Sequence, residues 1–174
     1  MNRAYLGIDV GSKGFITLNT NNELKFFSIK DNDYYQLSNI LFDIKSKYPN
    51  VVCVMEEVHA LFGSSAKSTF SFGEINGLLK GLLIANKIPY HLVQPKKWQS
   101  EIWENKDLIV NYKDVTIKGK VVKKKEINTK QTSLNAAKRI FPNIDFRKTE
   151  RCKIFDDNKV DSLLISEYGR RKNL

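Results

Sequence analysis

The sequence has few of the residues that cross-link a chain and none of the long apolar runs that cross a membrane. Its two cysteines, Cys53 and Cys152, form neither a disulfide framework nor a CxxC metal-binding pair. No stretch of about 18 apolar residues is present, so we expect no membrane span. The segment MNRAYLGIDV also lacks the apolar core of a signal peptide. These absences favour a reducing, intracellular compartment, the cytoplasm.

Acidic residues are in the minority, which leaves a strongly basic chain. There are 29 lysines and arginines against 19 aspartates and glutamates, and the net charge is +10. Such an excess favours polyanionic partners, nucleic acid above all. The hydrophobic fraction of 41% is ordinary for a globular protein, and the length suits one domain over residues 1–174.

The order of apolar patterns predicts an α/β fold with a mixed five-stranded sheet flanked by helices. The predicted strands cover 5–10, 15–19, 23–29, 51–58 and 89–93. The predicted helices cover 34–48, 72–85, 95–103, 129–140 and 157–168, with a loop over 63–68. We expect Thr129 to cap the fourth helix and Gly169 to end the last one. A basic, irregular insertion fills 104–128, and its middle, 108–122, has the pattern of a hairpin turning at Gly119.

Two carboxylates stand at the ends of apolar strands. Asp9 interrupts the run Gly7-Ile8-Asp9-Val10-Gly11, and Glu56 follows the run 51–55. A charge buried in such a strand costs on the order of several kcal/mol unless it is paired or binds a metal. Two structural alternatives stay open. Asp9 could serve as a turn former, and Glu57 could point inward in place of Glu56, since neighbours on a strand face opposite sides.

A second pair of carboxylates, Asp157 and Asp161, is four residues apart on the last predicted helix and shares one face of it. Four carboxylates without His or Cys favour hard cations, Mg²⁺ or Mn²⁺. Two such ions could support the hydrolysis of a phosphodiester. The alternative for Asp157 is a helix N-cap, and Asp156 and Asn158 are further candidates for the fourth position.

The motifs around these residues resemble the RuvC-like Holliday junction resolvases of the ribonuclease H-like superfamily, in particular the short phage and poxvirus versions. The segments that match are GIDVGSKG, VVCVMEEVHA, SSAKSTFSFGEINGLLKGLL, IPYHLVQPKKWQ, NTKQTSLNAAKRIFPN and RKTERCKIFDDNKVDSLLISEYGRR. The resemblance implies a ribonuclease H-like fold and a homodimer that uses Mg²⁺ or Mn²⁺, two ions per site, to cut branched DNA. It places the catalytic carboxylates on Asp9, Glu56, Asp157 and Asp161.

The resemblance also implies basic and aromatic residues near the cut. Lys130 matches the family's catalytic lysine, and Lys97 is a weaker match. The family's stacking aromatic falls at His59, with Phe62 a few residues later. We further expect phosphate contacts from basic side chains around the acidic site. The predicted DNA-binding residues are Lys13, Phe62, Lys67, Lys97, Lys123, Lys124, Lys125 and Arg151.

Three rival functions follow from the same motifs. An actin-like ATPase or sugar kinase also opens with a GIDxG-type turn, but this chain is short for that fold and has no second glycine-rich phosphate motif. Another ribonuclease H-like nuclease, acting on flaps, three-way junctions or RNA–DNA hybrids, stays open. A basic DNA-binding module without catalysis would be expected to lack the acidic residues.

Overall fold

The computed structural model describes residues 3–57, 65–117 and 120–174. Seven strands are β1 (Tyr5–Asp9), β2 (Phe15–Asn19), β3 (Leu24–Ser28), β4 (Val52–Glu56), β5 (Tyr90–Val93), β6 (Val110–Ile117) and β7 (Lys120–Ile127). The helices are α1 (Tyr34–Lys47), α2 (Ala66–Ala85), α3 (Pro95–Ile102), α4 (Thr129–Ile140) and α5 (Asp157–Lys172), with a 3₁₀ turn, η1 (Asn105–Asp107). None of the helices in these ranges has the length and apolar character needed to cross a membrane.

Five of the strands form a mixed sheet in the order β3-β2-β1-β4-β5. β1 pairs antiparallel with β2 and parallel with β4, so that Ile8 lies between Ile16 and Met55. β4 pairs parallel with β5. The prediction of a mixed five-stranded sheet is therefore confirmed.

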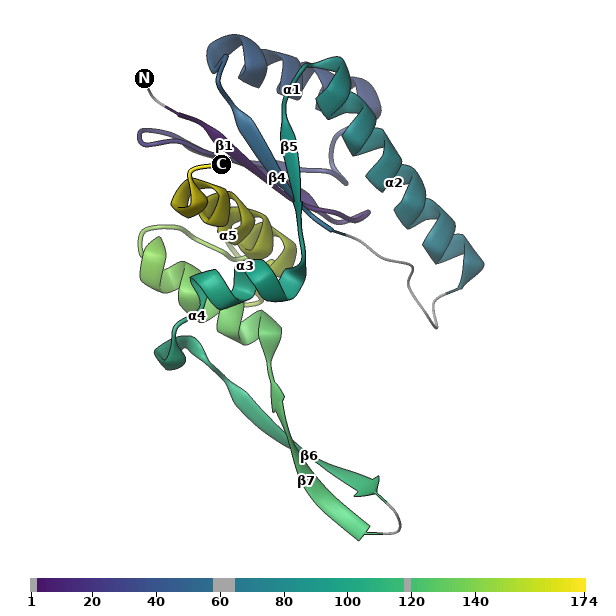
Figure 1. The fold of residues 1–174 in the computed structure, drawn as a ribbon, viewed down its shortest axis with the longest axis vertical. Helices are drawn as coiled ribbons and strands as arrows, with labels where there is room; N and C mark the ends of the chain where they lie inside the picture. The colour runs from purple at the N-terminus through teal and green to yellow at the C-terminus, as the bar shows by residue number, and fades with distance from the viewer. Residues whose placement is uncertain (1–2, 58–64, 118–119) are drawn as a thin grey trace.

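Helices cover both faces of this sheet, α1 and α2 on one face and α3, α4 and α5 on the other (Figure 1). Strand alternation divides the core accordingly. Leu6 and Met55 pack in the cluster that includes Leu41 and Leu79, whereas Val54 packs in the cluster with Leu164. The two central strands are therefore buried from both sides, as their nearly continuous apolar runs indicate.

Two glycines let α5 lie directly on the sheet. A Cβ atom added to Gly7 would stand 2.0 Å from the carbonyl oxygen of Ser162, and one added to Gly169 would stand 2.7 Å from a methyl carbon of Val54. The expectation that Gly169 ends the helix is therefore wrong. This glycine lies inside α5 because it faces β4, and the helix continues to Lys172 before Asn173 adopts a left-handed conformation with φ 51°.

Other predicted boundaries also shift. α2 begins at Ala66, six residues before the predicted start, because Ser65 caps it by accepting a hydrogen bond from the Ser68 backbone N–H. The predicted loop 63–68 thus contains the first turn of a helix. The cap of α4 is Asn128, whose side chain accepts from the Gln131 N–H, and not Thr129.

The basic insertion is more regular than its composition predicts. β6 and β7 pair over their full lengths, with Val110 opposite Ile127, so the hairpin extends to 127 and not only to 122. The predicted turn residue, Gly119, lies outside the described residues. The hairpin projects from the body as a twisted ribbon (Figure 1).

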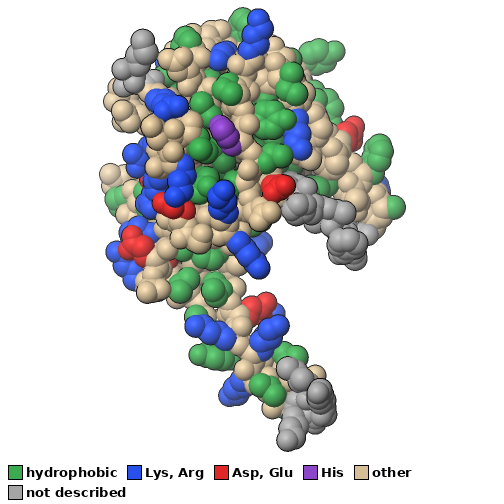
Figure 2. Space-filling model, in the orientation of Figure 1, with side chains coloured by type: hydrophobic (Ala, Val, Ile, Leu, Met, Phe, Trp, Pro, Cys, Tyr) green, Lys and Arg blue, Asp and Glu red, His purple; other side chains and the backbone are tan. Residues whose placement is uncertain are grey.

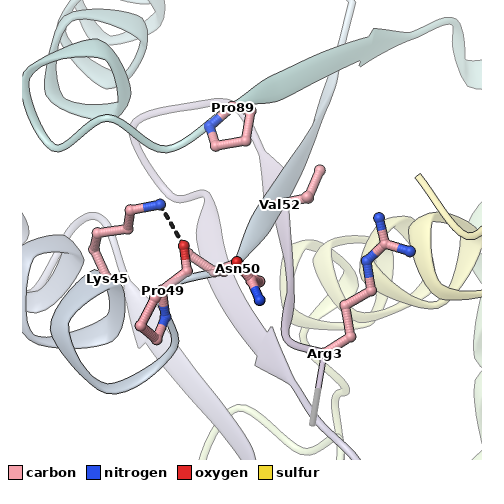
Figure 3. Close-up of a pocket in the computed structure, with 7 residues that line it drawn as sticks. Arg3, Lys45, Pro49, Asn50, Val52 and Pro89 are labelled. Carbon is pink, nitrogen blue, oxygen red and sulfur yellow. Dashed lines mark hydrogen bonds between the residues drawn. The ribbon is translucent and has the colours of Figure 1, made fainter. Parts of the chain in front are cut away.

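A cavity of about 400 Å³ opens where β1, β4 and β5 begin (Figure 3). Its lining includes Arg3, Lys45, Val52 and Pro89. Because the three strands are parallel, this cavity lies at the opposite end of the sheet from Asp9 and Glu56. It is therefore separate from the acidic residues that the sequence singled out.

Candidate active site

Asp9 and Glu56 end two neighbouring parallel strands. The register of β1 and β4 pairs Ile8 with Met55, so the next residue of each strand stands at the same edge. Asp9 shares a face with Gly7, which contacts α5, and Glu56 shares a face with Val54, which packs in the cluster of α5. Both carboxyl groups are thereby directed to the side of the sheet that α5 covers.

α5 brings Asp157 and Asp161 to the same edge. The hydroxyls of Thr17 on β2 and Ser162 on α5 are 2.7 Å apart in a buried hydrogen bond, which fixes the helix across the sheet. Asp161 directly precedes Ser162, and Asp157 lies one turn earlier. The four predicted carboxylates are therefore gathered from two strands and one helix.

The crowding of these groups is visible in their pKa values. The pKa of Asp9 is raised well above its ordinary value by burial first, and then by the charges of Asp161, Glu56 and Asp157. Burial raises the pKa of Asp161 to about 7, where a hydrogen bond with Ser133 opposes the shift and the charge of Glu56 adds to it. The positive charge around these carboxyl groups is thus too small to keep their pKa values at the ordinary level.

Glu56 is held by an indole that the sequence reasoning did not single out. Trp98 on α3 is almost fully buried, and its Nε1–H donates to Oε1 of Glu56 at 2.9 Å. Burial raises the pKa of Glu56, and this hydrogen bond opposes the rise. The only sequence signal was the position of Trp98 in the quoted segment IPYHLVQPKKWQ. The alternative in which Glu57 takes this place is not favoured, since it is the charge of Glu56 that acts on Asp9 and Asp161.

Lys130 forms an ion pair with Asp157. Burial is the largest single effect on the pKa of Asp157 and works to raise it, but the hydrogen bond from Lys130, a backbone hydrogen bond and the charges of Lys130 and Lys148 together lower it. The pKa of Lys130 is raised in turn, through the same hydrogen bond. The predicted lysine and the predicted helix carboxylate are therefore brought together, and one of the four acidic charges is balanced.

The N-cap of α5 is Asp156, whose side chain accepts from the Lys159 N–H at 3.4 Å. The alternative that Asp157 is only the cap is therefore wrong, because the preceding residue takes that place. Asp157 is the carboxylate that faces Lys130.

The donor chemistry of the site suits a hard cation. Oδ1 of Asp161 is buried and has no hydrogen-bond partner among the described residues. Within those same residues, however, no three His, Cys, Asp or Glu side chains stand close enough to hold one ion together. Mutual repulsion keeps uncompensated carboxylates apart, so a cation would have to draw these side chains inward. The site fits a metal in the nature of its ligands and in its unmatched charge.

The predicted basic residues lie at several places around this edge. Lys13 is exposed in the turn after Asp9, and Lys67 is exposed in the first turn of α2. Lys67 lines a cavity of about 390 Å³ together with Ser12, which places it beside the Lys13 turn. Lys97 is exposed on α3 next to Trp98, and Arg151 is exposed in the segment before α5.

The three consecutive lysines of the hairpin do not share one surface. In the β6–β7 register, Lys123 and Lys125 fall on one face of the ribbon, with Tyr112 opposite Lys125. Lys124 falls on the other face, opposite Lys113. The predicted aromatic residues His59 and Phe62 lie outside the described residues.

No protein-family model matches the sequence, and no curated protein matches it. Solved structures do match. RuvC of Thermus thermophilus in complex with a Holliday junction substrate superposes with a TM-score of 0.55 at 9% identity, covering 97% of this chain and 96% of that one. A second T. thermophilus RuvC structure gives 0.53 at 8% identity, over 98% and 96% of the two chains.

The yeast mitochondrial Holliday junction resolvase Ydc2 superposes with a TM-score of 0.51 at 16% identity, over 96% of this chain and 77% of that one. The agreement extends over nearly the whole chain, so it includes the sheet and the helix that gather the four carboxylates. The chain therefore has the RuvC-type, ribonuclease H-like fold that its sequence motifs resemble.

Proposed function

We propose that this protein is a metal-dependent endonuclease that cleaves branched DNA, with the four-way Holliday junction as its preferred substrate. One observation carries the proposal. Asp9, Glu56 and Asp161, with Asp157 beside them, converge at the carboxyl edge of a RuvC-type sheet, and the pKa values of Asp9 and Asp161 are raised even though Lys130 pairs with Asp157. The net charge of +10 and the junction-bound RuvC structure support branched DNA as the substrate.

The metal we propose is Mg²⁺, with Mn²⁺ as a substitute, and two ions per site. Asp9, Glu56, Asp157 and Asp161 would hold the ions through oxygen ligands, which both ions prefer. Such ions supply a water with a lowered pKa and stabilise the leaving oxygen of a phosphodiester. Oδ1 of Asp161, which has no hydrogen-bond partner among the described residues, would be one of these ligands.

Side chains of the protein would assist the metal ions in orienting the ligands and binding the phosphate. Trp98 orients Glu56 through the 2.9 Å hydrogen bond, so that this carboxylate keeps one direction. Lys130 is exposed and pairs with Asp157, which leaves its ammonium within reach of a phosphate entering from solvent. There it would stabilise the negative charge that develops on the phosphorus oxygens. The exposed residues Lys13 and Lys67 would contact the DNA backbone near the cut.

A homodimer is part of the proposal, and α2 is the surface we expect it to use. Gly73, Gly77 and Gly81 recur every four residues on this helix, and a Cβ atom added at any of them would meet nothing within 4 Å. The exposed side chains of Phe70 and Ile84 flank the stripe. Two such helices could cross closely, and a two-fold dimer suits a substrate with near two-fold symmetry.

The test compares binding with cleavage. Purified protein with Mg²⁺ or Mn²⁺ is offered four-way, three-way, flap, RNA–DNA hybrid and linear duplex substrates. We expect cleavage of the four-way junction, and we expect Asp9→Asn and Glu56→Gln to abolish it while gel-shift binding persists. Asp43→Asn, on the exposed side of α1, is the matched control.

Two outcomes would contradict the proposal. Junctions that are bound but never cut in either metal would indicate a binding module. Equal cutting of branched and linear DNA would indicate a nuclease without junction selectivity.

A further inference from the structure

The β6–β7 hairpin is an arm that stands clear of the body (Figure 1). Its two strands have eight residues each and pack mainly on each other. At about 3.4 Å per residue, the ribbon reaches roughly 27 Å from its root. A two-stranded ribbon of this kind has little stability of its own in water, so the fold must hold its root.

The root of the arm is held by a buried ion pair. The Asp107 carboxylate, which is 2% exposed, accepts from Arg139 Nε at 3.0 Å and from Arg139 Nη2 at 2.7 Å. Arg139 Nη2 also donates to the Ile102 carbonyl oxygen at 2.8 Å. This pair ties η1, which enters the arm, to α4, which leaves it. The forked geometry fixes direction as well as distance.

Backbone hydrogen bonds close the root. The Asn128 N–H donates to the Ile109 carbonyl oxygen at 2.8 Å, so the two ends of the ribbon are joined. The Ile109 N–H donates to Oγ1 of Thr132 at 3.1 Å, and the Asn135 side chain donates to the Asp107 carbonyl oxygen at 3.0 Å. These bonds fix the arm to α4 at a set angle. Lys130 lies two residues after Asn128, whose N–H joins the two ends of the ribbon.

The surface of the arm combines positive charge with exposed apolar groups. Residues 110–127 contain six lysines and two acidic residues, a net charge of +4. Tyr112 is 67% exposed and Val121 is 70% exposed. Figure 2 shows lysine and hydrophobic side chains along the ribbon, with few acidic ones. This charge is complementary to a phosphate backbone, and a two-stranded ribbon fits the major groove, which is about 12 Å wide.

We propose that the β6–β7 arm engages a duplex arm of the branched substrate at a distance from the cut, and that the Asp107–Arg139 pair sets its angle. The inference rests on the proposed function for the identity of the DNA. A reach of roughly 27 Å from the root corresponds to about 8 base pairs at 3.4 Å each. The arm adds binding energy without touching the reacting phosphate, and Arg139 is a positioning residue.

The experiment varies the arm length of the DNA. Four-way junctions are prepared with arms of about 20 base pairs, which are longer than the reach of the ribbon, and with arms of about 6 base pairs, which are shorter than it. Dissociation constants are measured in EDTA for the wild type, for a triple variant with alanine at Lys123, Lys124 and Lys125, and for Lys45→Ala, a control at the opposite end of the sheet (Figure 3).

We expect the wild type and Lys45→Ala to bind the long-armed junction roughly tenfold more tightly than the short-armed one. The triple variant should bind both with the lower affinity. Its slope of log affinity against log salt should be shallower by about 2 to 3, one unit for each lost phosphate contact. In cleavage assays it should show a raised KM on long arms and an unchanged kcat.

Arg139→Lys tests the positioning role. It keeps a positive charge opposite Asp107 but loses the fork. We expect a raised KM on long-armed junctions and the wild-type KM on short-armed ones, a difference that general destabilisation would not produce.

An equal arm-length dependence in the wild type and the triple variant would overturn the inference. So would a triple variant that changes from dimer to monomer in sedimentation, because the arm would then serve a second copy of the chain. If the wild type never cuts DNA but the arm-length dependence persists, the proposed function fails and the arm inference stands.

Discussion

Without a bound metal ion, this protein should become less stable as the pH rises from 5 to 7. In the folded chain the pKa of Asp161 is raised from 3.8 to about 7, first by burial. The folded state therefore keeps a proton on this carboxyl over a range in which the unfolded chain has released it. The free energy of unfolding therefore decreases as the pH rises through this range, and the decrease levels off above pH 7.

The magnitude follows from the shift. Each pH unit between the two pKa values corresponds to about 1.4 kcal/mol, and the slope is halved where the pH reaches the folded-state pKa, so the free energy of unfolding should fall by about 2 kcal/mol between pH 5 and pH 7. Asp9, whose pKa is also raised, acts in the same direction. Carboxylates with a lowered pKa, such as Asp145 at about 2, are ionised in both states across this window and contribute nothing to the slope.

The assay is urea unfolding in EDTA, followed by the fluorescence of Trp98 and Trp103, at half-unit steps from pH 5 to pH 8. Asp161→Asn should raise the stability at pH 7 by about 3 kcal/mol and leave the slope due to Asp9 and Glu56, whose pKa values are also raised. Asp145→Asn, the control, should keep the wild-type slope. Added Mg²⁺ should reverse the trend, because it binds the ionised carboxylates. A metal-free stability that is flat or rising over this range would refute the reasoning.

Three further predictions concern single residues. Lys130→Ala should lower kcat on four-way junctions roughly hundredfold, with gel-shift affinity nearly unchanged. Trp98→Phe removes the hydrogen bond that lowers the pKa of Glu56, so the acid limb of the pH–rate profile should move to higher pH. Gly7→Ala would place a Cβ atom 2.0 Å from the Ser162 carbonyl oxygen; we expect a loss of at least about 3 kcal/mol in thermal or urea unfolding.

The sequence alone determined the mixed sheet and the position of two carboxylates at the ends of its strands. Apolar runs end at Asp9 and at Glu56, and parallel pairing of such runs puts both ends at one edge. The spacing of Asp157 and Asp161 likewise fixed their common helix face. These features follow from local periodicity, which does not depend on the rest of the chain. The RuvC-type fold was inferred separately, from the resemblance of the sequence motifs to that family.

Only the tertiary structure decided which groups meet across elements. Trp98 reaches Glu56 and Lys130 reaches Asp157 because α3 and α4 pack beside α5, and no spacing along the chain encodes those contacts. Gly169 had the local signal of a helix end, but its contact with Val54 keeps it inside α5. The alternation of side chains on a paired ribbon separated Lys124 from its neighbours Lys123 and Lys125. Each of these contacts depends on which segment of the chain packs against the residue. Packing between segments far apart in the sequence decides that.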